Sequence, residues 1–519
     1  MKKSKQHISL TLALIMLLSS VASCSESKNT EDGGNKASGS NGNDSQTQND
    51  TSESETDEAE TEKLYPDLPA DLSFDGADVR IMQHPQQSGD WSDWLSRDLY
   101  AESYTGEPIN DAVYERNAYV SDKYKVNLDI IDVSDMPGTI KKQSTSGTDD
   151  YHISTARVNS LPNVALGGYL MNLYDVDYID LEKPWYDDKC IADASYYGLL
   201  YYVTGSMIIL DDDSTGAMVF NKQLIKDLNL DSPYQMVLDG TWTFDKMKEY
   251  AQEAAHDLNG NGEVDIDGDR FGILWQRDAI ISFLHAGGSR IVQKDENGDP
   301  QFVIGDEHSV NVMDKLDSFM YDPTVAQNMH NYGNKYPDIY AGECAIFKNN
   351  NALFMWVRMR VVENLRDMEA DFGIIPVPKY DKEQKDYYST VNAYTAATIC
   401  IPNSAALDLK LTGAVIEAMS AEGHYGLREA YYENNLGKKI ARDPDSTEML
   451  DIIMNNRVYD TGEIYGIGGL SGQLYALSSG KNGVGLATLI KKTKKAATKS
   501  LEKSFVKEMK KLAGIESEG

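Results

Sequence analysis

The sequence predicts an α/β fold with parallel sheets, because strand-like and helix-like runs alternate along most of the chain. Short runs of β-branched and other apolar residues are separated by segments whose apolar residues recur every three to four positions. After Pro402 the pattern turns mostly helical. About 455 residues carry this pattern, which is enough for two to four domains of ordinary size.

The individual elements follow from local patterns. A helix is expected to begin after Thr243, a plausible N-cap, because Phe244, Met247 and Ala251 then recur at helical spacing. Further helices are predicted over 109–125 and 222–228. Strands are predicted over 78–82, 126–133, 151–156, 201–204, 217–220, 271–275, 344–347, 372–376 and 395–401.

The first 24 residues have the pattern of an export signal. Lys2, Lys3 and Lys5 precede an apolar run over 8–18, and small residues follow it. That run is too short to span a bilayer, which is typical of a secretory signal. Residues 21–24, Val-Ala-Ser-Cys, resemble a bacterial lipobox, which implies that Cys24 carries a diacylglyceryl group. The alternative is a plain secretory signal with a chance cysteine.

Residues 25–63 are predicted to be a disordered acidic tether. The segment has eleven acidic residues against three lysines and almost no apolar residue. Such a chain buries too little apolar surface to offset the entropy cost of folding. Placed after a lipidated cysteine, it would hold the folded body clear of the membrane.

Charge and cysteine content exclude several classes of protein. The net charge of −33 disfavours both nucleic acid and anionic lipid as partners, since each requires basic patches. Besides Cys24, the cysteines are Cys190, Cys344 and Cys400, which have no metal-site spacing. We therefore expect small buried side chains instead of a disulfide framework.

One segment matches the spacing of a calcium-binding loop. Oxygen-bearing side chains occupy the first, third, fifth and ninth positions, and a glycine at the sixth permits the turn. The final position departs from an EF-hand, because it holds Gly268, with an acid one residue later. A structural Ca²⁺ site would therefore clip a helix to the next strand, with ligands Asp257, Asn259, Asn261, Glu263, Asp265 and Asp269. The alternative is an acidic turn that binds nothing.

Several segments, taken in order, resemble the solute-binding lipoproteins of Gram-positive ABC importers, a class related to maltose-binding protein. The resemblance covers most of the chain from Asp78 to Leu512 and rests on segments 107–117, 180–186, 220–222, 240–244, 271–272, 371–379 and 442–446. It implies a type II periplasmic-binding-protein-like fold of two α/β lobes, joined by a hinge of two or three crossing strands.

The same resemblance implies the domain boundaries. The N-terminal lobe would span 64–205 with a return segment at about 397–435, and the C-terminal lobe would span 206–396 and include the calcium-like loop. A C-terminal helical region, 436–519, would pack on the lobes. The hinge crossings would lie near 201–205 and 394–401, and ligands would bind beyond the carboxyl ends of the strands.

Candidate ligand-binding residues are mostly aromatic, because aromatic faces match the apolar faces of sugar rings. Trp356 falls where the maltose-binding class places a stacking tryptophan, although its apolar neighbours also fit a core position. Arg358 could bind hydroxyls or a carboxylate. Tyr394 lies at the expected hinge, and Trp91 and Trp94 follow the first strand in a polar loop.

Asp212 lies in an acidic run over 211–213, just past the first expected hinge crossing, and could accept hydroxyl protons. The alternative for this run is a solvated turn. The glycine-rich segment 466–472 fits neither a dinucleotide nor a Walker spacing, so we do not expect a phosphate site there.

The function predicted from these observations is delivery of an oligosaccharide to an ABC importer by a lipid-anchored, monomeric binding protein. One alternative is a surface enzyme that degrades glycans, since paired carboxylates cannot be recognised in a chain so rich in acids. Others are a surface adhesin, or a binding protein for a non-sugar solute such as a peptide. The chain has no HExxH or GxSxG motif.

The last predicted feature is a basic amphipathic helix. Residues 491–511 hold nine lysines and two glutamates, and one apolar stripe is formed by Ala497, Leu501, Phe505, Met509 and Leu512. Such a helix either lies on an anionic membrane or docks its stripe on the body with its lysines toward water. We expect the stripe to dock.

Overall fold

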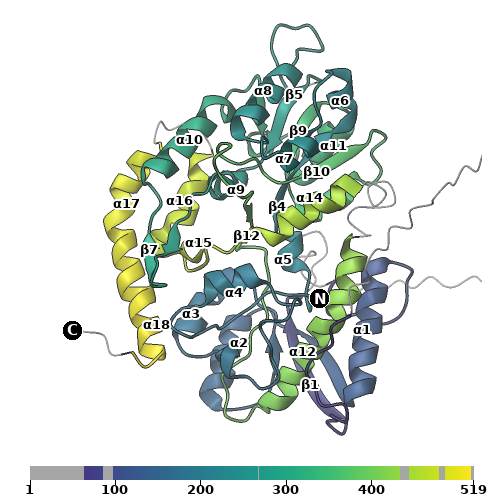
Figure 1. Ribbon diagram of the computed structural model, residues 1–519, viewed down its shortest axis with the longest axis vertical. Coiled ribbons are helices and arrows are strands. Elements are labelled where there is room, and N and C mark those ends of the chain that lie inside the picture. The colour runs from purple at the N-terminus through teal and green to yellow at the C-terminus, as the bar shows by residue number, and fades with distance from the viewer. Residues whose placement is uncertain (1–62, 86–96, 267, 433–443, 479–484, 516–519) are drawn as a thin grey trace, which may run out of the picture. The chain divides into compact units, whose positions relative to one another are not determined.

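The computed structural model describes residues 63–85, 97–266, 268–432, 444–478 and 485–515 (Figure 1). The export signal, Cys24 and nearly all of the acidic tether therefore lie outside the described residues, as do Trp91 and Trp94. Within the described ranges, every helix is too short or too polar to cross a bilayer.

The first lobe is built on a three-stranded parallel sheet in the order β2–β1–β3. The strands are β1 (Ala77–Gln83), β2 (Val126–Asp132) and β3 (Ile153–Ser154). Helices α1 (Pro108–Tyr124) and α2 (Met136–Ser146) provide the crossovers that parallel strands require. Glu107 and Asp135 cap their N-termini. Other helices of this lobe are α3 (Pro162–Leu166), α4 (Asp188–Ala194) and α12 (Leu409–Tyr425).

The second lobe is built on a five-stranded mixed sheet in the order β10–β4–β9–β5–β8. Its strands are β4 (Gly216–Asn221), β5 (Phe271–Trp275), β8 (Ala326–Asn328), β9 (Ala352–Arg358) and β10 (Phe372–Ile375), and all are buried along their length. β5 runs parallel to β8 and β9, whereas β4 runs antiparallel to β9 and β10. Burial on both faces explains why β4, β5, β9 and β10 read as nearly continuous apolar runs.

Helices and a hairpin complete the second lobe. They are α6 (Lys222–Asp227), α7 (Pro233–Leu238), α8 (Phe244–Ala254), α9 (Ala279–Ala286), α10 (Glu307–Met320), α11 (Ile339–Lys348), α14 (Pro444–Asn455) and the hairpin of β6 (Val292–Lys294) and β7 (Pro300–Phe302). Thr243 caps α8 through its side chain, in agreement with the sequence.

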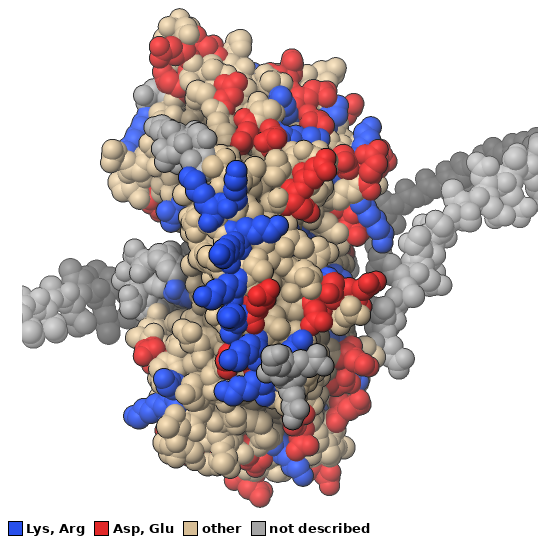
Figure 2. Space-filling model, turned by 90° about the vertical axis from the view of Figure 1, so that its left-hand side faces the viewer, with Lys and Arg blue, Asp and Glu red and all other residues tan. Residues whose placement is uncertain are grey.

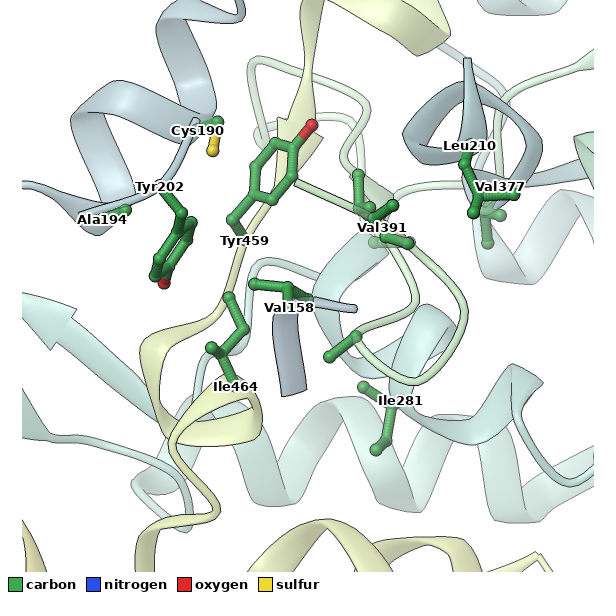
Figure 3. Packing of buried hydrophobic residues seen from close by; sticks show 14 of the residues in the cluster. Val158, Cys190, Ala194, Tyr202, Leu210, Ile281, Val377, Val391, Tyr459 and Ile464 are labelled. Atoms are coloured by element: carbon green, nitrogen blue, oxygen red, sulfur yellow. The ribbon is translucent and has the colours of Figure 1, made fainter. Parts of the chain in front are cut away.

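The two lobes meet at short extended segments. Val203 pairs with Ile399, and Thr215 pairs with Val391, both antiparallel. The short strand β11 (Ser389–Thr390) runs parallel to β12 (Arg457–Val458). Val203, Ile399 and Val391 share one buried cluster with Val158 and Tyr459, and Val158, Val391 and Tyr459 lie close together in it (Figure 3). The two segments predicted to form the hinge therefore lie side by side at the junction.

The C-terminal helices contact both lobes (Figure 1). α17 (Leu486–Ser500), a π-helical turn (Leu501–Val506) and α18 (Lys507–Leu512) form one nearly continuous helix. Ile490 lies against Gly305 of the second lobe, and Leu512 against Gly168 of the first. The predicted apolar stripe is buried, since Ala497, Leu501, Phe505 and Met509 are 3% exposed or less and Leu512 packs on the core.

Three predicted strands differ in the structure. Residues 201–204 and 395–401 are extended segments with isolated β-bridges instead of regular strands. Residues 344–347, predicted as a strand, lie inside helix α11, which Asp338 caps at its N-terminus. A four-residue apolar run cannot distinguish a strand from one buried turn of helix, and here the capping residue decides. Cys190, Cys344 and Cys400 are free and buried, as predicted from their spacing.

Candidate functional site

A pocket of about 470 Å³ lies beyond the carboxyl ends of two parallel strands of the second lobe. β5 ends at Trp275 and β9 at Arg358, and the pocket is lined by Arg277, Asp278, Tyr340, Arg358, Asn392, Tyr394, Thr395, Gly472 and Tyr475. Ligands of open α/β sheets bind at this edge, because loops rather than side-chain layers occupy it. Its volume lies within the usual range for small-molecule sites.

Two tyrosines supply the aromatic surface of this pocket. Tyr394 is 42% exposed, and its ring centroid lies 5.9 Å from that of Tyr475, with a tilt of 59° between the planes. The Tyr475 hydroxyl donates to Glu463 Oε1 at 3.0 Å, which fixes the ring. Burial raises the pKa of Glu463 to about 8, with Asp460 nearby as a further cause. A rigid ring beside an exposed one is a surface on which a sugar face can stack.

Polar groups are held at the rim by short local contacts. The Tyr394 backbone N–H donates to Asn392 Oδ1 at 2.9 Å, so the hinge turn fixes the Asn392 side chain. Arg358 is buried, donates to the Tyr340 hydroxyl and lies with its guanidinium 5.2 Å from the Tyr340 ring centroid. The pocket thus combines an aromatic surface with fixed donors, which is the chemistry that recognises hydroxyl groups.

The strand ends of the first lobe lie close to the same hinge segment. After β3, the Asn159 N–H donates to the Ala393 carbonyl at 3.2 Å, and the Val158 N–H donates to the Ala396 carbonyl at 3.0 Å. Near these strand ends, burial and Arg157 lower the pKa of His84 to about 4. Polar groups of the first lobe are therefore placed near the segment that carries Tyr394.

Two of the predicted ligand-binding residues come together in this pocket, Arg358 and Tyr394. Trp356 does not, because it is 2% exposed and packs in the apolar core. Alternate side chains of β9 point to opposite faces, and both faces are covered, so this indole has no free face for stacking. The structure thus gives Trp356 the core position, not the stacking position implied by the resemblance.

Asp212 also lies away from this pocket. Its carboxylate pairs with Arg457 at 2.5 Å, and Arg457 also pairs with Asp187 at 2.6 Å and Asp211 at 3.0 Å. These residues line a separate pocket of about 560 Å³ at the lobe junction. Because Arg457 holds all three carboxylates together, we interpret the cluster as structural.

Sequence reasoning missed most of the pocket lining. Arg277 and Asp278 lie one residue beyond the strand predicted at 271–275, so a polar pair after a buried strand was an available signal. Tyr475 lies on α16 (Leu470–Leu477), far along the chain, and no local pattern connects it with the strand ends.

The calcium-like loop connects α8 to β5, and His256 and Arg270 close it with a pair of backbone hydrogen bonds. Asp257 accepts from the N–H groups of Gly260 at 2.6 Å and Gly262 at 2.8 Å. Asp269, predicted as a ligand, is 1% exposed and accepts three backbone N–H groups of the loop. The predicted ligands therefore share one turn.

Within the described ranges, no three His, Cys, Asp or Glu side chains converge as a metal site would require. Each of the loop's hydrogen bonds uses one oxygen lone pair, and carboxylate oxygens can accept further partners. The oxygen-rich donor set is the one that Ca²⁺ prefers, so the calcium site stays a prediction.

If the loop binds calcium, millimolar Ca²⁺ is expected to raise the melting temperature, because a ligand that binds only the folded state stabilises it. Asp257→Ala with Asp265→Ala is expected to abolish the rise. Glu296→Ala with Glu383→Ala, which removes two exposed carboxylates elsewhere, should preserve it. An unchanged melting temperature of the wild type with and without chelator would contradict the site.

Comparisons with known proteins show the fold. No protein-family description matches this chain, and no curated protein sequence matches it. A cyclo/maltodextrin-binding protein solved with maltotetraose is 11% identical, with a TM-score of 0.55 and coverage of 83% of this chain and 99% of the other. The chain has the two-lobed fold of type II solute-binding proteins.

Two further solved structures show the same likeness. UspC of Mycobacterium tuberculosis is 14% identical, with a TM-score of 0.54 and coverage of 81% and 99%. UgpB of the same organism, solved with glycerophosphocholine, is 15% identical, with a TM-score of 0.51 and coverage of 78% and 98%. The predicted two-lobed α/β fold is therefore confirmed.

Proposed function

We propose that this protein is an exported solute-binding protein that captures an oligosaccharide between its lobes and delivers it to an ABC importer. The observation that carries the proposal is the pocket at the strand ends, where Tyr394 is exposed beside Tyr475 at the hinge. A ligand that contacts both lobes there would favour the closed arrangement.

Similar structures support a sugar as the ligand class. The cyclo/maltodextrin-binding protein was solved with maltotetraose, and a Listeria monocytogenes ABC substrate-binding protein, 14% identical with a TM-score of 0.50, was solved with cycloalternan. The glycerophosphocholine complex of UgpB shows that this fold also accepts other solutes. The aromatic pair of the present pocket favours the sugar.

The pocket lining favours binding over glycoside hydrolysis. Hydrolysis of a glycosidic bond usually needs two carboxyl groups on either side of the bond. Among the described residues that line this pocket, Asp278 is the one with a carboxyl group. A glycan-degrading enzyme is therefore the second candidate function, after oligosaccharide binding.

Binding is tested by a thermal-shift screen across a panel of oligosaccharides, followed by calorimetry on the best ligand. Tyr394→Ala is expected to weaken that ligand roughly tenfold, because a stacking contact contributes up to about 1.5 kcal/mol. Tyr119→Ala removes a tyrosine of nearly equal exposure, 41%, on α1 and should leave affinity unchanged.

Equal affinity of the Tyr394→Ala variant and the wild type would contradict this site. Chromatography of the same incubations distinguishes a binding protein from an enzyme, because only an enzyme would release shorter sugars from the oligosaccharide.

The lipid anchor belongs to the same proposal. Cys24→Ala is expected to release the protein from the membrane fraction or to block its processing, since the thiol is the proposed site of acylation. Metabolic labelling with a fatty acid should mark the wild type and leave the variant unmarked. Retention of the variant at wild-type levels would contradict the anchor.

A further inference from the structure

A row of lysines follows the exposed face of the C-terminal helix. Figure 2 shows this face, on which Lys and Arg side chains gather along the line of α17 and α18. Seven lysines of this helix are exposed and take part in none of the ion pairs found within the described residues: Lys491, Lys492, Lys494, Lys495, Lys499, Lys503 and Lys507. At 1.5 Å per residue, these lysines extend over about 25 Å. We call this row the lysine ridge.

The apolar side of the same helix is already used. Ala497, Phe505 and Met509 are 1% exposed or less, and Phe505 packs edge-on against Tyr196 at 5.0 Å and Tyr465 at 4.6 Å. The helix therefore has no free apolar face to insert into a membrane. Any partner of the ridge must be held by charge alone.

The lysine ridge is positively charged, whereas the whole chain is strongly negative. The chain carries a net charge of −33, which would repel an anionic surface. At physiological ionic strength, however, charges more than about 8 Å apart are largely screened, so the local row decides what binds there. Two acidic residues on the helix, Glu502 and Glu508, offset little of the positive charge of the ridge, and Glu508 pairs with Lys511 at 3.6 Å.

We propose that the lysine ridge is a docking surface for the anionic lipid headgroups of a membrane, held purely by electrostatic attraction. Such contact would orient the lobes relative to the bilayer. A straight row on one helix suits a flat array of phosphates, and each lysine near such a surface increases binding about fivefold.

The sequence gives an independent reason to choose a membrane. Cys24 is the predicted site of lipidation, and 62 residues precede the described part of the chain. A lipid chain and a polybasic patch reinforce each other, because the first contact raises the effective concentration of the second. A free anionic polymer would gain nothing from this linkage.

The test uses the full chain with Cys24→Ala, so that acylation does not dominate binding. Co-sedimentation is measured with vesicles of phosphatidylglycerol and phosphatidylcholine, and with vesicles of phosphatidylcholine alone. Binding is expected only to the anionic vesicles and should be lost in high salt. Lys492, Lys495, Lys499 and Lys503, all changed to Gln, should lower it by about 100-fold or more.

A matched control carries the same loss of charge elsewhere, with Lys142, Lys226, Lys382 and Lys385 changed to Gln. These lysines are exposed and lie outside the C-terminal helix, so the control should bind like its parent. Both variants should keep the parent's melting temperature, since only exposed side chains change.

Three results would overturn the proposal. The ridge variant could bind anionic vesicles like its parent, or the control variant could lose binding equally. The parent could also bind soluble polyphosphate while ignoring anionic vesicles at equal phosphate, which would assign the ridge to a free polymer instead.

Discussion

Deletion of residues 486–519 is expected to lower the melting temperature strongly, because the C-terminal helix is part of the core of both lobes. Its buried side chains are Leu486, Leu489, Ile490, Ala497, Leu501, Phe505 and Met509. The deletion would also expose the faces that now cover them, including the rings of Tyr196 and Tyr465. The expected loss exceeds that of any single side chain and approaches the whole stability of a typical domain.

A point variant measures the contribution of side-chain packing without removing part of the chain. Phe505→Ala is expected to cost about 3–5 kcal/mol of unfolding free energy, because it leaves a cavity between two tyrosine rings. Ser504→Ala changes an exposed neighbour and should stay within about 0.5 kcal/mol of the wild type. Denaturant unfolding measures both. Equal stability of the two variants would show that the stripe does not support the fold.

Arg457→Ala is expected to cost about 3–5 kcal/mol, because it removes the cation shared by three carboxylates, of which Asp187 and Asp211 are buried. Arg457 contacts Asp187, Asp211 and Asp212 within 3.0 Å and is 11% exposed. Asp187 also caps α4 and accepts from the Tyr459 hydroxyl at 2.8 Å. The cluster thus connects the first lobe, α5 (Leu210–Asp213) and β12.

The pH dependence of this loss has a definite sign. Burial, followed by Asp212, already raises the pKa of Asp211, and removing Arg457 should raise it further. A raised folded-state pKa means that the folded protein binds more protons, so stability falls as pH rises above the ordinary carboxyl range near 4. The deficit of Arg457→Ala should therefore shrink toward pH 4 and grow toward neutrality.

Arg366→Ala serves as the control, since Arg366 is 41% exposed and its carboxylate partner Glu363 lies 3.9 Å away. Exposed pairs of this kind contribute about 0–1 kcal/mol. A loss for Arg457→Ala no larger than that of Arg366→Ala would contradict the structural role of the cluster.

Local patterns predicted the regular elements well where packing and periodicity agree. The strand at 271–275 and the cap at Thr243 are found where the sequence places them, because each depends on neighbouring residues. The strand prediction for 344–347 was wrong, because a short apolar run is compatible with either a strand or a buried turn of helix.

The candidate site was predictable only in part. Arg358 could be named because it lies two residues after Trp356, which the resemblance places at the ligand, and Tyr394 because it lies at the expected hinge. The sequence allowed Trp356 either a ligand-binding or a core position. The structure gives it the core position, because both faces of β9 are covered. Asp212 could not be distinguished from a free acid, because its partner Arg457 lies far along the chain.

The glycine-rich segment 466–472 shows where sequence reasoning ends. Its spacing alone excluded a phosphate loop. The reason for its glycines is seen only in the structure, where the segment packs against α17. Gly468 has a φ of +64° and lies so close to Ala497 that a methyl group would overlap that helix. The sequence by itself predicted an export signal and determined the alternation of strands and helices and the basic helix, because each is encoded by adjacent residues. Which side chains meet at the pocket, at Arg457 and under the lysine ridge was decided by tertiary packing, because those contacts join segments tens to hundreds of residues apart.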